Sequence, residues 1–134
     1  MARRAKQASI ELAAADTALK NKALSEIARS LTDRQAEILQ ANAADIELSE
    51  QANLAPPLLK RLKFDTAKIA DVVAGINSLI NLPDPVGVTL AATELDQGLE
   101  LYRVSCAIGV IGVIFESRPD ALVQISTLCL KSGN

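Results

Sequence analysis

Residues 107–134 read AIGVIGVIFESRPDALVQISTLCLKSGN, and this stretch decides the fold class. Its opening run, residues 107–115, is apolar throughout and rich in Val, Ile and Gly. Such a run is typical of a strand that is covered on both faces in a parallel sheet. Pro119 then marks a helix entrance, and Gly133 suits the left-handed backbone that ends many helices. The order strand, loop, helix and glycine turn predicts the first part of a βαβ unit, and therefore an α/β protein.

A parallel strand needs a neighbouring strand, and the sequence contains no second apolar run of this kind. We therefore expect the 134 residues to be the N-terminal part of a longer α/β protein, inactive if taken alone. The isolated chain is expected to fold poorly or to associate, because its sheet edge is unpaired. The alternative is a self-contained helical interaction module without catalysis, which could not cover such a strand.

The first 80 residues predict helices, because apolar side chains recur there at three- and four-residue spacing. The residues expected to cap or open these helices are Thr17, Thr32 with Gln35, Pro56 with Pro57, and Asp65. The sequence LPDP at 82–85 is expected to end the last of them.

Between residues 86 and 106 the hydrophobic period changes from 3.6 to 2, which predicts two strands. The sequence Asp96-Gln97-Gly98 is expected to join them as a hairpin, since Gly98 can adopt a positive φ. A two-stranded ribbon is too small to be stable alone. It is therefore expected to lean on another part of the fold or on another subunit.

Composition excludes several classes of function. The chain has no histidine, so no Ser-His-Asp or Cys-His pair and no four-ligand zinc site can be built from it. A net charge of −2 and 2% aromatic residues argue against nucleic-acid binding. No apolar stretch is long enough for a membrane span, and no signal peptide is recognisable, so the cytoplasm is the expected location. Cys106 and Cys129 are expected to be small core residues.

The motif E-S-R-P at 116–119, followed by C-L-K-S-G-N at 129–134, resembles the γ-glutamyl phosphate reductases, also called glutamate-5-semialdehyde dehydrogenases. RRAKQAS (3–9), ILQANAADI (38–46), LLKRLKFD (58–65) and LPDPVG (82–87) agree with this family in order, so the resemblance covers essentially the whole chain. It implies an aldehyde-dehydrogenase-like α/β fold. Residues 1–82 would then be a helical segment, residues 86–106 a hairpin or oligomerisation arm, and residues 107–134 the first strand and helix of a Rossmann-type NADP-binding domain.

The resemblance also implies a reaction, the NADPH-dependent reduction of L-glutamyl 5-phosphate to L-glutamate 5-semialdehyde in proline biosynthesis. In this family a cysteine thiolate attacks the acyl phosphate, and that cysteine is expected beyond residue 134, so no catalytic residue is expected within the chain. A homo-oligomer is expected for the complete protein. The alternative enzyme is another aldehyde-dehydrogenase-like oxidoreductase.

Candidate ligand-binding residues follow the predicted strand, because open α/β folds bind ligands at the carboxyl ends of strands. The residues expected to contact the cofactor are Phe115, Glu116, Ser117 and Arg118. Arg118 and Asp120 are expected to contact the substrate. The guanidinium of Arg118 could clamp a phosphate, or it could pair locally with Glu116 or Asp120.

Three positions in this part of the chain carry finer expectations. Ser117 is expected to cap the following helix rather than to bind ligand. Asp120 stands where the family often has Asn, which puts an amide-donor role in doubt, since a carboxylate repels an anionic ligand. Lys131 is expected to complement a helix dipole rather than to reach a phosphate.

Overall fold

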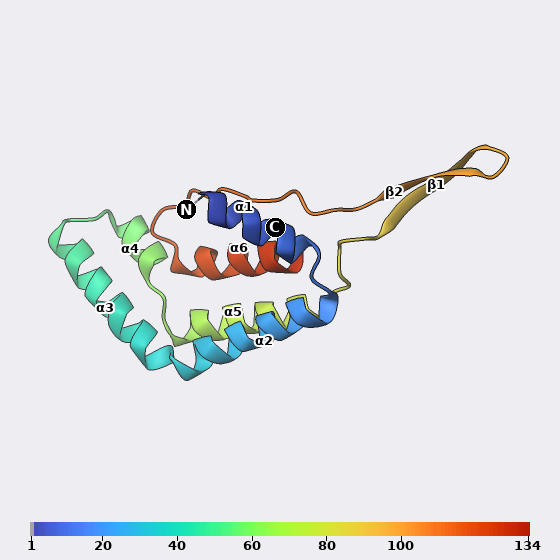
Figure 1. Cartoon of the computed structure of the whole chain (residues 1–134). Coiled ribbons are helices and arrows are strands. Elements are labelled where there is room, and N and C mark those ends of the chain that lie inside the picture. Colours follow the sequence, from blue (N-terminus) through green and yellow to red (C-terminus); the bar gives the residue numbers. More distant parts are fainter. Residues whose placement is uncertain (1) are drawn as a thin grey trace.

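The structure is a computed structural model that describes residues 2–134. Five helices lie within residues 2–81, and a hairpin and a final helix follow (Figure 1). In chain order the elements are α1 (Ala2–Ala13), α2 (Thr17–Asp33), α3 (Gln35–Gln51), α4 (Pro56–Leu62), α5 (Thr66–Asn81), β1 (Thr89–Asp96), β2 (Leu99–Val104) and α6 (Pro119–Lys131). None of the helices described is long and apolar enough to cross a membrane.

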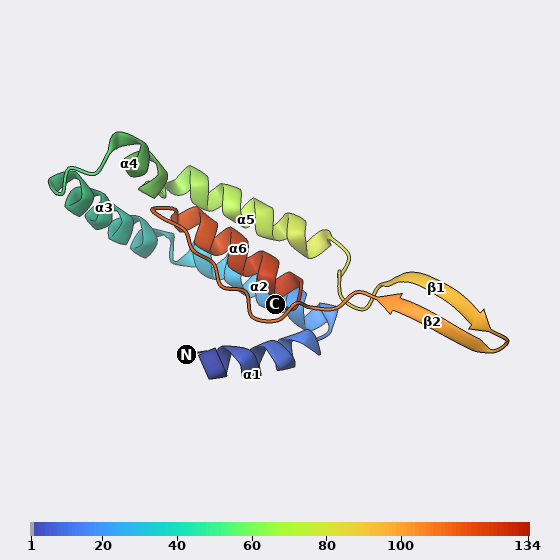
Figure 2. The ribbon, with the colours of Figure 1, turned by 90° about the horizontal axis from the view of Figure 1, so that it is seen from above.

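The core lies where α2, α5 and α6 run side by side (Figures 1 and 2). Its first cluster of buried residues consists of Leu24, Ala28, Ile76 and Leu79. Val123 and Leu130 of α6 pack against this cluster. Burying a Leu or Ile side chain contributes about 1.5–3 kcal/mol, so this three-helix contact dominates the stability of the fold.

A second cluster joins α5 to the preceding loop and consists of Phe64, Ile69 and Val72. Asn42 of α3, itself buried, holds this region by two hydrogen bonds. Its Nδ2 donates to the carbonyl of Leu62 over 2.9 Å, and its Oδ1 accepts from the amide of Phe64 over 2.7 Å. Asn42 therefore satisfies the backbone that links α4 to α5.

The predicted helix boundaries are confirmed in part. Asp65 caps α5, because its Oδ1 accepts from the amide of Lys68 over 3.1 Å. The cap of α2 was misplaced by one residue: Asp16, not Thr17, accepts from the amide of Leu19 over 2.7 Å. A carboxylate caps a helix as well as a hydroxyl does. Asp16 lies just before the helix and has the extended backbone that a cap residue needs.

The predicted capping box at Thr32 and Gln35 is wrong. Thr32 lies inside α2, and its hydroxyl donates to the carbonyl of Ala28. The chain bends at Arg34, which ends α2 and precedes α3 without a side-chain cap. Thr32 is thus bonded back along its own helix, a common alternative for a hydroxyl within a helix.

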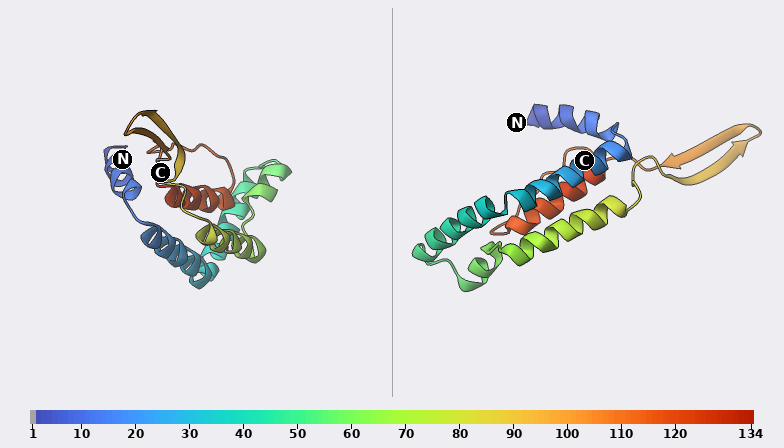
Figure 3. Two further views of the ribbon diagram at one scale, coloured as in Figure 1. Left: turned by 90° about the vertical axis from the view of Figure 1, so that its right-hand side faces the viewer. Right: turned by 90° about the horizontal axis from the view of Figure 1, so that it is seen from below.

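The predicted hairpin is confirmed. β1 pairs with β2 in antiparallel register, and Gly98 adopts a φ of +76° in the connecting turn. Every residue of both strands is exposed, and the hairpin projects beyond the helices (Figures 1 and 3). At its base, paired backbone hydrogen bonds of 2.9 Å join Gly87 to Ser105 and Ser105 to Val88.

The predicted strand at 107–115 is not formed within the described chain, whose one sheet consists of β1 and β2. The segment is irregular, with Ile108 86% exposed and Ile114 fully exposed. A strand exists only through hydrogen bonds to a partner, and residues 2–134 offer this segment none. The chain nevertheless keeps the predicted order, since this segment leads into α6.

The prediction that both cysteines lie in the core is wrong for the same reason. Cys106 is exposed, Cys129 is half-buried, and their thiols are free. Both line the groove between the apolar segment and α6, and the side chains of that segment are exposed here.

Candidate functional site

Residues 115–120 comprise the loop that connects the extended segment to α6 and the first two residues of that helix, and they include every predicted ligand-binding residue. Ser117 adopts a φ of +48°, in the left-handed region that a non-glycine residue enters only at a cost of about 1–2 kcal/mol. Pro119 then opens α6, as predicted. The strained Ser117 backbone redirects the chain between the segment and the helix, which is a feature often found at ligand-binding loops.

Ser117 does not cap α6, so that prediction is wrong. The residue at the cap position is Arg118, with a φ of −137° and no side-chain cap hydrogen bond. Because Ser117 lies one position too early, its hydroxyl cannot take the place of a cap. The first turn of α6 therefore keeps amide groups that no capping side chain satisfies.

Arg118 forms the predicted local pair with Asp120 rather than with Glu116. Its Nη2 lies 3.5 Å from Oδ2 of Asp120, and the two side chains are 51% and 19% exposed. An ion pair this open to water contributes about 0–1 kcal/mol. An incoming anion could therefore displace Asp120 at little cost, so the local pair does not remove Arg118 from consideration as an anion clamp.

Phe115 and Glu116 are both exposed at the end of the apolar segment. The five predicted residues thus lie together at the N-terminus of α6, four of them in the preceding loop and Asp120 in the first turn of the helix. Their arrangement combines one cation with a helix terminus, which suits an anionic group. Asp120 opposes such a group, as its sequence position suggested.

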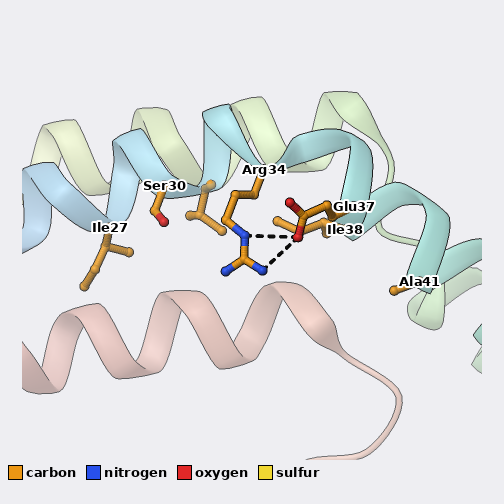
Figure 4. Close-up of a pocket in the computed structure, with 7 residues that line it drawn as sticks. Ile27, Ser30, Arg34, Glu37, Ile38 and Ala41 are labelled. Atoms are coloured by element: carbon orange, nitrogen blue, oxygen red, sulfur yellow. Dashed lines mark hydrogen bonds and ion pairs between the residues drawn. The ribbon is translucent and has the colours of Figure 1, made fainter.

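Hollows also lie elsewhere on the described chain, and two of them have volumes of about 500 Å³. A groove of about 500 Å³ separates the extended segment from α6 and is lined mainly by apolar side chains, among them Ile108, Ile111 and Leu128. A second hollow, of about 490 Å³, lies at the bend between α2 and α3 (Figure 4). There Arg34 donates to Glu37 over 2.8 Å, and this hydrogen bond lowers the pKa of the Glu37 carboxyl. Neither hollow is lined by a predicted site residue.

Lys131 is not available to a ligand. Its side chain is buried, and its Nζ donates to Oδ1 of Asn21 over 2.8 Å and to the carbonyl of Ile80 over 3.2 Å. That carbonyl belongs to the last turn of α5. The lysine therefore complements a helix C-terminus, as expected. It lies in the last turn of α6, and its ammonium group contacts the last turn of α5.

Two polar residues with defined contacts were missed from the sequence. Asp84 binds Lys20 across the fold, and Asn134 binds the amides of Ile108 and Gly109. The position of Asp84 between two prolines, and of Asn134 directly after Gly133, marks each as the polar residue of a turn. No pattern in the sequence predicts which distant residues they bind.

No family model matches the chain. Curated relatives do: the proteins named γ-glutamyl phosphate reductase from Acetivibrio thermocellus and from Pelotomaculum thermopropionicum are each 70% identical over all 134 residues. The solved structure of γ-glutamyl phosphate reductase from Thermotoga maritima matches with a TM-score of 0.95 and 38% identity over 99% of the chain. The chain spans 31% of the length of each of these curated relatives and 32% of that solved chain.

The helices, the projecting hairpin and the segment leading to α6 therefore match the N-terminal part of a class of larger proteins that bear the name of a reductase. Within that class, sequence and fold both confirm the predicted resemblance to the γ-glutamyl phosphate reductases.

Proposed function

We propose that this chain is the N-terminal part of an oxidoreductase of proline biosynthesis that reduces L-glutamyl 5-phosphate to L-glutamate 5-semialdehyde with release of phosphate. The observation that carries this proposal is the 70% identity, over every residue of the chain, to relatives that bear the name γ-glutamyl phosphate reductase. The proposal includes membership of the aldehyde dehydrogenase superfamily and a cytoplasmic location, in keeping with a step of amino-acid biosynthesis.

The proposed cofactor is NADPH, which when bound supplies the hydride for the reduction. The residues proposed to contact it are Phe115, Glu116, Ser117 and Arg118. The loop fits an anionic cofactor, because the Arg118 guanidinium is half-exposed and no side chain caps the first turn of α6. The Ser117 backbone holds this loop in one bent conformation, which reduces the entropy lost on binding.

Arg118 and Asp120 are proposed to contact the acyl phosphate substrate. A planar guanidinium binds phosphate through two parallel hydrogen bonds, so Arg118 would orient the group. Asp120 would steer Arg118 until the anion arrives, since their pair is weak enough to exchange. We propose no catalytic role for Cys106 or Cys129.

We further propose that the complete protein is a homo-oligomer that uses the hairpin as its contact. The apolar side chains that the hairpin exposes are Leu90, Leu95, Leu99, Leu101, Tyr102 and Val104. Both edges of the two-stranded ribbon are open to a further strand. A second subunit would cover these side chains and pair an edge.

The test is an assay of the full-length protein that contains this chain, run in reverse with glutamate 5-semialdehyde, phosphate and NADP⁺. We expect formation of NADPH that depends on phosphate. Arg118→Met should weaken binding of the anionic ligand about tenfold, while Arg29→Met, at an exposed pair, should leave activity unchanged. Oxidation of simple aldehydes without a need for phosphate would contradict the proposal.

A further inference from the structure

The hairpin is joined to the helices by a short neck, which consists of residues 82–88 between α5 and β1 and of Ser105 directly after β2. Every residue of both strands is exposed, and the ribbon projects away from the helices in each view (Figures 2 and 3). The strands therefore take little support from the helices. The angle at which the hairpin leaves the fold depends on how the neck is held.

Asp84 binds the first part of the neck to α2. Its Oδ2 accepts from the ammonium of Lys20 and from the hydroxyl of Thr17, each over 3.0 Å, and its Oδ1 accepts from the amide of Val86 over 2.9 Å. The Lys20 side chain is 1% exposed and that of Asp84 is 13% exposed, so solvent ions screen this pair little. A proline stands on each side of Asp84, and its ring restricts the backbone there.

Ser105 closes the neck from the other strand. Its hydroxyl donates to the carbonyl of Pro85 over 2.6 Å and accepts from the amide of Val88 over 2.9 Å. Its backbone carbonyl accepts from the amide of Gly87, and its amide donates to the carbonyl of Val88. Gly87 has a φ of +81° and would be a flexible point in a single connecting chain. The hydrogen bonds of Ser105 hold the residues on both sides of it.

The neck also contacts the end of α6. A Cβ added at Gly133 would lie 3.5 Å from Cγ2 of Val86, so Val86 packs closely against this helix end. Just before the neck, the carbonyl of Ile80 accepts from the buried ammonium of Lys131, which also donates to Asn21 of α2. These contacts join the neck, α2, α5 and α6. They do not depend on what covers the apolar segment at 107–115 in the complete protein.

We propose that Asp84 and Ser105 are positioning residues for the contact between subunits, an inference that rests on the homo-oligomer proposed above. They hold the hairpin at the angle at which a second copy of the protein binds it. In a closed symmetric oligomer every hairpin makes the same contact, so every hairpin must leave its subunit at the same angle. A ribbon that swings on a loose neck loses this freedom on association, and the loss weakens binding.

The test is sedimentation equilibrium of the full-length protein over a series of concentrations, which gives the dissociation constant of the oligomer. Ser105→Ala removes the hydroxyl that holds Pro85 and Val88, and should raise this constant about tenfold. Ser105→Thr keeps a hydroxyl and should restore tight association. Asp84→Asn removes the charge that binds Lys20, and should raise the constant at least as much as Ser105→Ala.

Two further variants separate the angle of the hairpin from general stability. Asn42→Leu removes two hydrogen bonds of a buried side chain in α3, at the opposite end of the helices from the hairpin (Figure 1). It should lower stability about as much as Asp84→Asn does, yet leave the dissociation constant unchanged. Leu101→Asp places a charge on the exposed hairpin itself and should prevent association.

Unchanged association in Ser105→Ala, with Leu101→Asp dissociated, would overturn the positioning role and leave the hairpin contact standing. Weakening by Asn42→Leu as large as that by Asp84→Asn would also overturn it, because stability alone would then explain the effect. Ser105→Ala decides the question alone if Asp84→Asn does not fold. A full-length protein that stays monomeric would overturn the proposed homo-oligomer as well, whereas the assay with glutamate 5-semialdehyde decides the proposed reaction separately.

Discussion

The Nζ atom of Lys20 lies 3.0 Å from Oδ2 of Asp84, although 64 positions separate the two residues. The Lys20 side chain is buried, and Asp84 also accepts from the hydroxyl of Thr17 over 3.0 Å and from the amide of Val86 over 2.9 Å. One carboxylate thus ties the first turn of α2 to the chain that leads into the hairpin. The direction in which the hairpin leaves the helices depends on this contact.

We predict that Asp84→Ala lowers the free energy of unfolding by about 2–4 kcal/mol, because it leaves the buried Lys20 ammonium without a counter-charge. Chemical denaturation followed by circular dichroism measures the change. Glu26→Gln is the matched control: its pair with Arg29 is exposed, so the loss should stay within about 0.5 kcal/mol. Similar losses in both variants would contradict the importance of burial.

The same carboxylate should make stability depend on pH. Burial raises the pKa of Asp84, but the hydrogen bonds from the Val86 amide, the Lys20 ammonium and the Thr17 hydroxyl outweigh it and hold the pKa below the usual 3.8. A group whose pKa is lowered on folding contributes stability that is present above its unfolded pKa and is lost as pH falls through its folded pKa.

The stability difference between the unaltered chain and Asp84→Asn should therefore be constant above about pH 5 and should shrink below about pH 3.8. Unfolding curves at several pH values measure this difference directly, so the titration of other carboxyl groups cancels. A difference that stays the same down to the lowest pH studied would show that the Asp84 charge contributes nothing to the contact.

The sequence allowed the local structure to be predicted, because its signals lie within a few residues of one another. The spacing of apolar residues predicted the helices. Asp65 predicted the N-cap of α5, and Gly98 predicted the hairpin turn. The predicted strand at 107–115 does not form within the described chain, because a strand needs a second segment to pair with. The apolar pattern predicts only the first of these two segments. Short-range patterns likewise say nothing of the partners of Asn134, which lie 25 and 26 positions away.

The site shows the same division. The sequence placed Ser117, Arg118 and Asp120 close to one another, and in the structure they lie at the N-terminus of α6 because they are neighbours in the chain. It did not decide which partner Arg118 takes, since side-chain geometry chooses Asp120 over Glu116. The positive φ of Ser117 was also beyond reach, because serine rarely adopts that conformation.

Asn42 offers a test of buried hydrogen bonding. Asn42→Leu should lower the free energy of unfolding by about 2–4 kcal/mol, because the amide of Phe64 and the carbonyl of Leu62 lose their partners in a buried setting. Asn81→Ala, at an exposed side chain that bonds only its own helix, is the control and should change little. Thermal denaturation measures both, and a neutral Asn42→Leu would mean that water replaces the lost bonds.

Two glycines give a paired prediction of opposite sign. Gly133→Ala should destabilise the chain by about 1–2 kcal/mol, because its φ of +74° disfavours a side chain and the new Cβ would crowd Ala107. Gly75→Ala, inside α5 with open space around the new Cβ, should stabilise it by about 0.5–1 kcal/mol. Melting temperatures measure the pair, and a stabilising Gly133→Ala would contradict the strained helix end.

Asp120→Asn should improve binding of the anionic ligand in the full-length protein. The substitution removes a negative charge from the first turn of α6 and frees Arg118, whose pair with Asp120 spans 3.5 Å. Because Arg118 is half-exposed and the pair lies at the protein surface, it is worth about 0–1 kcal/mol, and we expect KM for the anionic substrate to fall about threefold, with a weaker effect at high salt. Initial rates at two ionic strengths measure this, with Asp71→Asn on α5 as the distant control. A rise in KM would mean instead that Asp120 is needed to hold Arg118 in place. The position of the Arg118 guanidinium would then matter more to binding than the repulsion between Asp120 and the ligand.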